Sequence, residues 1–315
     1  MVSRQADQRS AVTKMSWGMF SLIFMTAFLP MCLFLFLVDH LSDIPRIEAV
    51  DFVGACPSLN GVVNSNECES NNDVIAIDFQ SVIDSFVNRT NGEKGIIIYD
   101  LMAGKIAGEY NADKKFATAS IYKLFVVYAG YLMVDRDEWS PNSPVGTTGH
   151  SIIECLDLAI RESDSPCAET LWGMIGRDEL DVIVQSDFDL PNVIVGSLSA
   201  TPREIMRMML NFYQHTEINN QSLVTIMKDS FLNQPITSYN WRQGLPSGFS
   251  DKARIYNKVG WEYDGSSWKI YDDAAIVSFP DVSRDFVVVV MTKGLNYKYI
   301  SQFGRDLETK FYENY

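Results

Sequence analysis

The sequence predicts an α+β protein in which helices pack against an antiparallel sheet of five strands. Strand-like runs lie at both ends of the folding region, two before and three after a block of helical patterns. Turn signals join neighbouring strands, and the strands do not alternate with helices in the manner of βαβ units. Strands from the two ends of the chain can therefore meet in one sheet.

An apolar segment near the N-terminus predicts a single transmembrane helix. Residues 17–38 carry no charge, and about 22 such residues are enough to cross a hydrocarbon core of roughly 30 Å. Basic residues precede this segment and mainly acidic residues follow it, so the positive-inside rule places the N-terminus in the cytoplasm and the remainder outside the cell membrane. We assign residues 1–14 to a cytoplasmic tail, 15–38 to the transmembrane helix and 39–73 to an extracytoplasmic linker. A cleaved signal peptide is the alternative, but the apolar region is too long for one.

The folded domain is expected over residues 74–315. Apolar residues at spacings of three and four predict its helices, and runs rich in β-branched residues predict its strands. In chain order the expected elements are a helix at 75–88, strands at 95–99 and 105–110, helices at 120–134, 151–161, 166–175 and 203–213, strands at 254–259, 273–279 and 285–292, and a helix at 296–315. Thr201, Pro202 and Glu204 occupy the N-cap, N1 and N3 positions of a capping box that opens the fourth of the central helices.

The charge balance argues against nucleic acid as a partner. The 315-residue chain carries 26 Lys and Arg against 40 Asp and Glu, which gives a formal net charge of −14. It has no basic block that would neutralise a phosphate backbone. The three histidines are scattered and the cysteines lack CxxC spacing, so we expect neither a metal site nor another cofactor.

Four of the five cysteines are expected on the oxidising side of the membrane. Cys32 falls within the predicted transmembrane helix, whereas Cys56, Cys68, Cys155 and Cys167 follow it. These four cysteines allow three pairings. A Cys56–Cys68 bridge is favoured because it would close a loop rich in Gly, Ser and Asn and stabilise the fold by roughly 3 kcal/mol. Cys155 and Cys167 are the candidate second pair.

Ser120 and Lys123 are candidates for nucleophilic chemistry. On a helix a spacing of three places both side chains on one face, so the lysine amine can reach the serine hydroxyl. A neutral lysine can remove the hydroxyl proton if its pKa falls from about 10.4 towards 7 or 8, which implies that the charged form is destabilised by roughly 4 kcal/mol. The alternative is a chance SxxK pattern in which Lys123 extends to the surface.

Two further motifs follow, and each is ordinary by itself. The sequence SDS at residues 163–165 lies in a short break between two expected helices, where a serine hydroxyl can project outward or an aspartate can cap a helix. The sequence KVGW at residues 258–261 lies at the end of a strand, where lysine supplies positive charge and glycine permits close approach of a ligand to the backbone.

Together and in this order, SxxK, SD[N/S] and K-x-G resemble the three active-site motifs of the serine penicillin-recognising enzymes, in particular class A β-lactamases and their penicillin-binding relatives. The stretch GIIIYDLMAGKIAGEYNADKKFATASIYKL is similar to that family's first hairpin and nucleophile helix, and DAAIVSFPDVSRDFVVVVMTKG is similar to its last two strands. The resemblance covers residues 75–315 and implies a serine β-lactamase/transpeptidase-like fold.

The resemblance also implies a role for each motif residue. Ser120 would be the acylated nucleophile, and Lys123 would be its general base. Ser163 would relay a proton to the leaving nitrogen, while Lys258 would orient Ser163 and attract a substrate carboxylate. The backbone amides of Ser120 and Trp261 match the positions that form the oxyanion hole in that family.

Three departures from the family pattern bear on substrate and rate. Among the positions that match the substrate-binding residues, Gly260 is retained, but Ser165 replaces an asparagine and Val259 replaces a Thr or Ser. Loss of the hydroxyl at Val259 should weaken binding of penicillin-like acids by roughly 1–3 kcal/mol. The deacylating glutamate of class A β-lactamases has no clear counterpart, and Asp187 and Asp189 are the candidate substitutes. Since losing a general base lowers rates by about 10² to 10⁴, the acyl-enzyme should persist.

Three functions are in competition on this basis. The leading one is a membrane-anchored, extracytoplasmic serine hydrolase that forms an acyl-serine intermediate with D-Ala-D-Ala-like cell-wall peptides or related amides. The runner-up is a true β-lactamase acting on β-lactam-like small molecules, and the non-enzymatic alternative is a catalytically impaired binding or sensor module on the same fold. The aromatic residues Trp261, Tyr263 and Trp268 either line a substrate groove or are partly buried packing, which is the commoner case.

Overall fold

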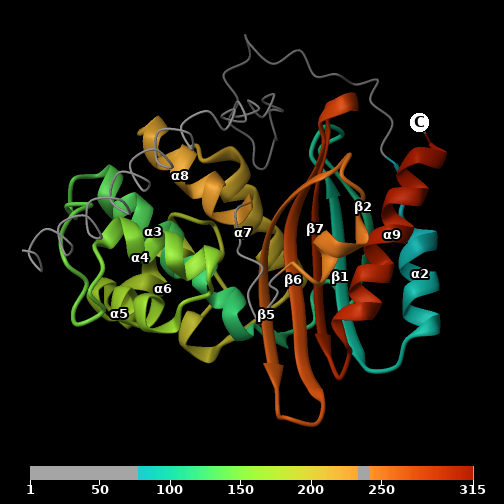
Figure 1. Ribbon diagram of the computed structural model, residues 1–315, viewed down its shortest axis with the longest axis horizontal. Helices are drawn as coiled ribbons and strands as arrows, with labels where there is room; N and C mark the ends of the chain where they lie inside the picture. The colour runs from blue at the N-terminus through green and yellow to red at the C-terminus, as the bar shows by residue number, and fades with distance from the viewer. Residues whose placement is uncertain (1–76, 233–241, 315) are drawn as a thin grey trace, which may run out of the picture. The chain divides into compact units, whose positions relative to one another are not determined.

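The computed structural model describes residues 77–232 and 242–314, and Figure 1 shows how their helices and strands are arranged. These residues belong to the expected folded domain. The expected cytoplasmic tail, transmembrane helix and linker lie outside them, as do Cys56 and Cys68. Among the helices that are described, none has the length and the apolar composition needed to cross a bilayer.

The central sheet has five antiparallel strands in the order β2-β1-β7-β6-β5. These strands are β1 (Glu93–Asp100), β2 (Lys105–Tyr110), β5 (Arg254–Tyr263), β6 (Trp268–Phe279) and β7 (Arg284–Lys293). β1 pairs with β7 along its whole length, so strands from the two ends of the sequence meet at the centre of the sheet. The expected α+β class and the five-stranded antiparallel sheet are confirmed. A smaller sheet joins β3 (Phe116–Ala117) to β4 (Ser199–Ala200).

Eight α-helices lie among the described residues. They are α2 (Gln80–Arg89), α3 (Lys123–Asp135), α4 (Ile152–Arg161), α5 (Ser165–Ile175), α6 (Arg177–Ser186), α7 (Pro202–Gln214), α8 (Gln221–Leu232) and α9 (Tyr297–Glu313). α6 and α8 are additions to the elements expected from the sequence, although α6 buries Leu180, Ile183 and Val184 at helical spacing. The capping box of α7 is confirmed: Glu204 N donates to Thr201 Oγ1 at 3.1 Å, and Thr201 N donates to Glu204 Oε2 at 2.8 Å.

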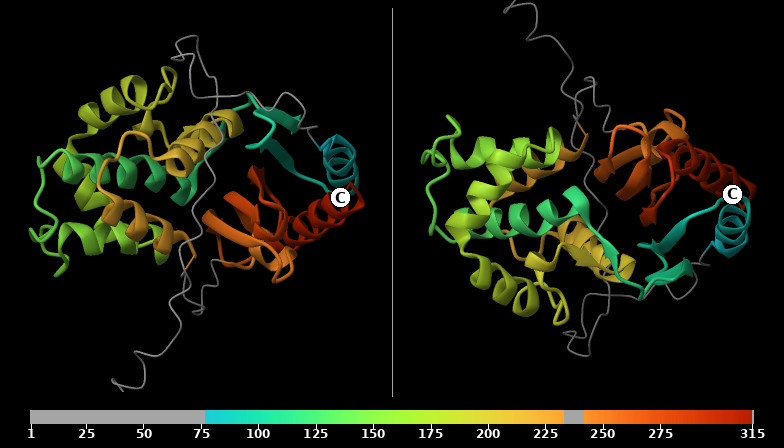
Figure 2. Two further views of the ribbon diagram at one scale, coloured as in Figure 1. Left: turned by 90° about the horizontal axis from the view of Figure 1, so that it is seen from above. Right: turned by 90° about the horizontal axis from the view of Figure 1, so that it is seen from below.

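Two hydrophobic cores cover the two faces of the sheet, because side chains along a strand alternate between faces. Figure 2 shows α2 and α9 along one face and the block of helices from α3 to α8 across the other. Val287 and Val289 belong to the core shared with the helical block, whereas Val288 and Val290 belong to the core under α2 and α9. α3 is buried on nearly all sides, which explains why its sequence has no polar face. Lys123, the first residue of α3, therefore lies inside a core.

Candidate active site

Ser120 lies in a 3₁₀ turn rather than in an α-helix, because η1 covers Ala119–Tyr122 and α3 begins only after it. Ala119 has a φ of 40°, in the left-handed region that a residue with a side chain rarely adopts. The turn is anchored at its start, where Thr118 N donates to Leu198 O at 2.9 Å. Ser120 itself is half-buried. A constrained backbone therefore presents one partly accessible hydroxyl.

Lys123 directs its amine towards the loop at residues 163–165 and is itself fully buried. Its Nζ donates to the backbone oxygen of Ser163, to Ser163 Oγ at 3.3 Å and to Ser165 Oγ at 3.0 Å. Among the described residues, no hydrogen bond joins Lys123 Nζ to Ser120 Oγ. The structure thus joins Lys123 to the second motif rather than to Ser120.

Burial controls the protonation of Lys123. It lowers the pKa of the amine from 10.5 to about 8, while the negative charges of Asp164 and Glu169 act in the opposite direction. A lysine with a pKa of about 8 is neutral in roughly one molecule in ten at pH 7. That fraction is sufficient for a general base, whose pKa works best near the operating pH.

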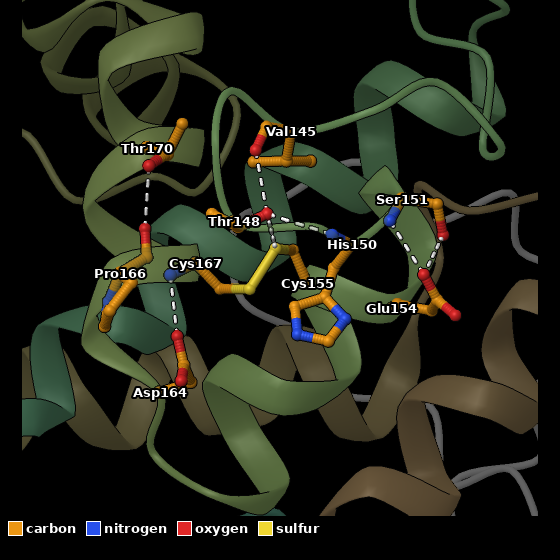
Figure 3. Close-up of a disulfide and its surroundings, with 10 residues drawn as sticks. All are labelled: Val145, Thr148, His150, Ser151, Glu154, Cys155, Asp164, Pro166, Cys167 and Thr170. Carbon is orange, nitrogen blue, oxygen red and sulfur yellow. Dashed lines mark hydrogen bonds between the residues drawn. A yellow bond between two sulfur atoms is a disulfide. The ribbon is translucent and has the colours of Figure 1, made fainter. Parts of the chain in front are cut away.

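The loop between α4 and α5 holds Ser163 in a left-handed backbone conformation, with a φ of 56°. Asp164, the next residue, caps the N-terminus of α5, because its Oδ1 accepts a hydrogen bond from Cys167 N at 2.7 Å. A fully buried disulfide between Cys155 and Cys167, with Cα atoms 4.9 Å apart, ties α4 to α5 (Figure 3). This bridge confirms the second of the two expected pairs. The cap and the disulfide together constrain the loop that carries Ser163.

Lys258 reaches the same serine from the sheet. It is fully buried on β5, and its Nζ donates to Ser163 Oγ at 2.9 Å and to Val259 O at 2.7 Å. Burial, and next the charge of Lys123, lower the pKa of Lys258 well below its usual value, while Asp273 acts in the opposite direction. Ser163 Oγ therefore accepts from two lysine amines whose positive charges disfavour each other.

Gly260 brings the third motif against the turn that carries Ser120. A Cβ built on Gly260 would lie 2.6 Å from Thr118 O and 3.1 Å from Ile121 N. β5 can therefore approach the backbone on both sides of Ser120 only because a glycine stands here. Trp261 follows directly, so the two amides expected to form an oxyanion hole belong to adjoining segments.

The side chain of Val259 does not join this site. Val259 is 1 % exposed and packs in the core under α2 and α9, since alternation along β5 places it on the opposite face from Lys258. The predicted aromatic group packs on that side too. Trp268 lies with its ring centroid 5.5 Å from that of Trp261 and 5.1 Å from that of Tyr263, which favours the packing alternative over a groove.

The two candidate deacylating carboxylates lie on the segment between α6 and α7. Asp187 forms an ion pair with Arg136 at 3.1 Å, just beyond the C-terminal end of α3. Because α3 has 13 residues and is about 20 Å long, Asp187 lies far from Lys123 at the other end. Asp189 is exposed, and its backbone oxygen accepts from Arg207 of α7 at 3.4 Å.

β6, which pairs with β5, carries two buried aspartates that the sequence analysis did not single out. Asp273 accepts from Asn257 Nδ2 at 2.9 Å and from Leu245 N at 2.8 Å, and burial raises its pKa to about 7. Asp272 accepts from Thr292 N at 2.7 Å, and burial raises its pKa well above the usual value. Two adjacent aspartates inside the run WKIYDDAAIVSF are the sequence signal that would have identified them. Within residues 77–232 and 242–314, no group of His, Cys, Asp and Glu is arranged to hold a metal ion.

Comparison with solved structures shows a shared fold. PBP-A is 21% identical with a TM-score of 0.63, over 75% of this chain and 96% of that one. An ancestral class A β-lactamase is 16% identical with a TM-score of 0.64, over 76% of this chain and 100% of that one. A mutant of PBP-A in an acyl-enzyme complex with penicillin G is 20% identical with a TM-score of 0.63, over 74% of this chain and 95% of that one.

Sequence comparison adds the family. No curated protein sequence matches the chain significantly. The sequence model of a family described as the β-lactamase enzyme family matches residues 78–311, which is most of the chain and includes all three motifs. The arrangement of Ser120, Lys123, Ser163 and Lys258 lies within the matched region. The chain therefore belongs to the β-lactamase enzyme family.

Proposed function

We propose that the protein is a membrane-anchored, extracytoplasmic serine hydrolase that forms an acyl-serine intermediate with D-Ala-D-Ala-like peptides or related amides. The convergence of two buried lysines on Ser163 Oγ, beside the turn that carries Ser120, is the observation that supports this proposal most strongly. Burying two amines is unfavourable, and perturbed lysines of this kind cluster at functional sites.

The reaction begins at Ser120. Neutral Lys123 accepts the hydroxyl proton as Ser120 Oγ bonds to the substrate carbonyl carbon, and the amides of Ser120 and Trp261 stabilise the developing oxyanion. The carbon–nitrogen bond then breaks. Ser163 donates its hydroxyl proton to the leaving nitrogen and is reprotonated by Lys123, which Lys258 assists by holding Ser163 Oγ in place. The products of this half-reaction are an acyl-serine and a free amine.

We expect slow deacylation because of where the candidate carboxylate Asp187 lies. Asp187 is held at the far end of α3, so it is not available to activate water at Ser120. A missing general base lowers a rate by about 10² to 10⁴. We therefore expect β-lactams to leave a persistent adduct, which favours a peptidase or transpeptidase-like activity over efficient β-lactam hydrolysis.

The test is covalent labelling with a fluorescent penicillin, followed by intact-protein mass analysis. The wild-type protein should gain the mass of one acyl group, Ser120→Ala should gain none, and Ser222→Ala, an exposed serine on α8, should label like the wild type. An unmodified wild-type protein would contradict the proposal and favour the binding module. A chromogenic cephalosporin separates the enzymes: rapid steady turnover indicates a β-lactamase, and a stoichiometric burst indicates a stalled adduct.

The membrane anchor is tested separately. It rests on the uncharged run at residues 17–38, which lies outside the described residues. The full-length chain should stay with the membrane after alkaline carbonate extraction, and protease added outside the membrane should digest the folded domain. Release by carbonate, or protection from the external protease, would argue against this topology.

A further inference from the structure

Four side chains form a closed ring of contacts beside the turn that carries Ser120. Tyr122 OH donates to Glu169 Oε1 at 2.5 Å, and Arg177 Nη2 forms an ion pair with Glu169 Oε2 at 3.3 Å. The Arg177 guanidinium lies 4.1 Å from the ring centroid of Trp172, and the rings of Trp172 and Tyr122 have centroids 5.4 Å apart. The ring joins η1 to α5 and to the first residue of α6.

The ring is built on the same elements that hold Lys123. Tyr122 directly precedes Lys123, and its ring centroid lies 6.0 Å from Lys123 Nζ. Ser165, which accepts from Lys123 Nζ, begins α5, and Glu169 lies four residues later on the same face of that helix. One turn of α5 therefore supplies a hydrogen-bond acceptor to the lysine, and the next supplies a negative charge.

Few other charges act on Lys123. Asp164 acts from the loop, but its side chain already caps α5, and Lys258 on β5 shares the hydroxyl of Ser163 with Lys123. Glu169 is the remaining carboxylate, and its side chain is 48% exposed, so solvent screens part of its effect.

We infer that Glu169 is a positioning residue for the acylation of Ser120, which fixes the nucleophile turn against α5 through Tyr122 and keeps Lys123 able both to accept and to return a proton. This inference rests on the proposed acyl-serine chemistry. A base that has lost its affinity for protons removes one poorly, and a base that holds them too tightly is rarely free. Burial lowers the affinity of Lys123 for protons, and the negative charge of Glu169 raises it.

The two parts of this role have separate signatures in a pH profile. Acylation should rise with pH as Lys123 loses its proton, so the midpoint reports the protonation of Lys123 and the plateau reports its geometry. Glu169→Gln removes the negative charge that raises the pKa of Lys123, so the midpoint should move to lower pH, by about half a unit. Tyr122→Phe keeps the charge but loses the hydrogen bond, so the plateau should fall, by about tenfold, with little movement of the midpoint.

The experiment measures the second-order rate of acylation by a fluorescent penicillin from about pH 6 to about pH 10. Glu169→Asp should restore the midpoint but not the plateau, since the shorter side chain keeps the charge and loses the reach to Tyr122. Glu162→Gln is the matched control. It removes an exposed carboxylate one residue before Ser163 that exerts no resolved effect on Lys123, and it should leave the profile unchanged.

A wild-type midpoint in Glu169→Gln, or an equal shift in Glu162→Gln, would overturn the inference. A second readout does not depend on acylation: NMR titration of ¹³C-labelled lysines, with the Lys123 signal assigned by its loss in Lys123→Ala. A lower pKa of Lys123 in Glu169→Gln supports the inference, and an unchanged one refutes it. If the wild type is never acylated, the proposed function fails, and the titration still decides whether Glu169 sets the charge of Lys123.

Discussion

Replacing Gly260 by alanine should separate the two segments that form the active site. The added Cβ would lie 2.6 Å from Thr118 O and 2.9 Å from Ile121 Cγ1, whereas ordinary contacts begin at 3.4 Å. The strand and the turn must therefore separate by about 0.8 Å at the oxygen, because a backbone atom cannot rotate away. Overpacking of this kind typically destabilises a protein by about 1–3 kcal/mol. For a domain of this size, that loss lowers the melting temperature by several degrees, at roughly 2–4 °C per kcal/mol.

The effect of Gly260→Ala on acylation should exceed its effect on stability. A displacement approaching 1 Å moves Ser120 relative to Lys258 and to the amide of Trp261, and misplacement on that scale lowers a rate by about a hundredfold. The measurements are thermal unfolding and the second-order rate of acylation by a fluorescent penicillin. Gly173→Ala on α5 is the matched control, since a Cβ there meets nothing within 4 Å and should stabilise the helix by about 0.5–1 kcal/mol. A Gly260→Ala protein that acylates at the wild-type rate would refute the reasoning.

Three further predictions follow from the same contacts. Acylation by the wild type should rise as pH passes through the pKa of Lys123 at about 8, and a rate that is flat from about pH 6 to about pH 10 would contradict its role as base. Val259→Thr should not improve penicillin binding, because the side chain is 1% exposed, and chemical denaturation should show a loss of about 1–3 kcal/mol from the buried hydroxyl; a gain in affinity would show that Val259 faces the ligand. Replacing Cys155 and Cys167 by alanine should lower stability by about 3 kcal/mol and slow acylation, since the 12-residue separation encloses Ser163; unchanged acylation would show that the loop is held without the bridge.

Local patterns were sufficient to predict most of the fold. The capping box at Thr201 and the β-branched runs of the last strands depend on neighbours in sequence, so they can be recognised without tertiary information. The meeting of β1 with β7 agrees with the order of strands, because strands from the two ends of an α+β chain can join one sheet. α6 escaped prediction because it is short and only Gly176 separates it from α5. Its apolar pattern therefore merges with that of α5.

The motif residues could be named from the sequence, but the contacts between them could not. Spacing on an ideal helix joins Lys123 to Ser120, yet Ser120 lies in a 3₁₀ turn and the amine bonds to Ser163 across the structure. The K-x-G motif predicts that Val259 contacts the ligand. In the structure, the alternation of side chains along β5 directs Val259 into the core on the opposite face of the sheet. Glu169 belongs to no sequence motif. Its hydrogen bond with Tyr122 forms only because η1 packs against α5 in the fold.

The burial of Lys123 and Lys258 is a stronger argument for catalysis than any one motif. Both side chains are fully buried, and both direct their amines to one hydroxyl, so each disfavours the charged form of the other. Replacing buried charges by apolar residues of similar volume often stabilises a fold, so structural needs alone would not keep two lysines here. The hydrogen bonds to Ser163 lower this unfavourable energy without removing it, since burial still depresses the pKa of each amine. The proposed reaction needs a proton carrier that is neutral at one moment and charged at the next, and in that proposal the serine between the lysines passes the proton to the leaving group.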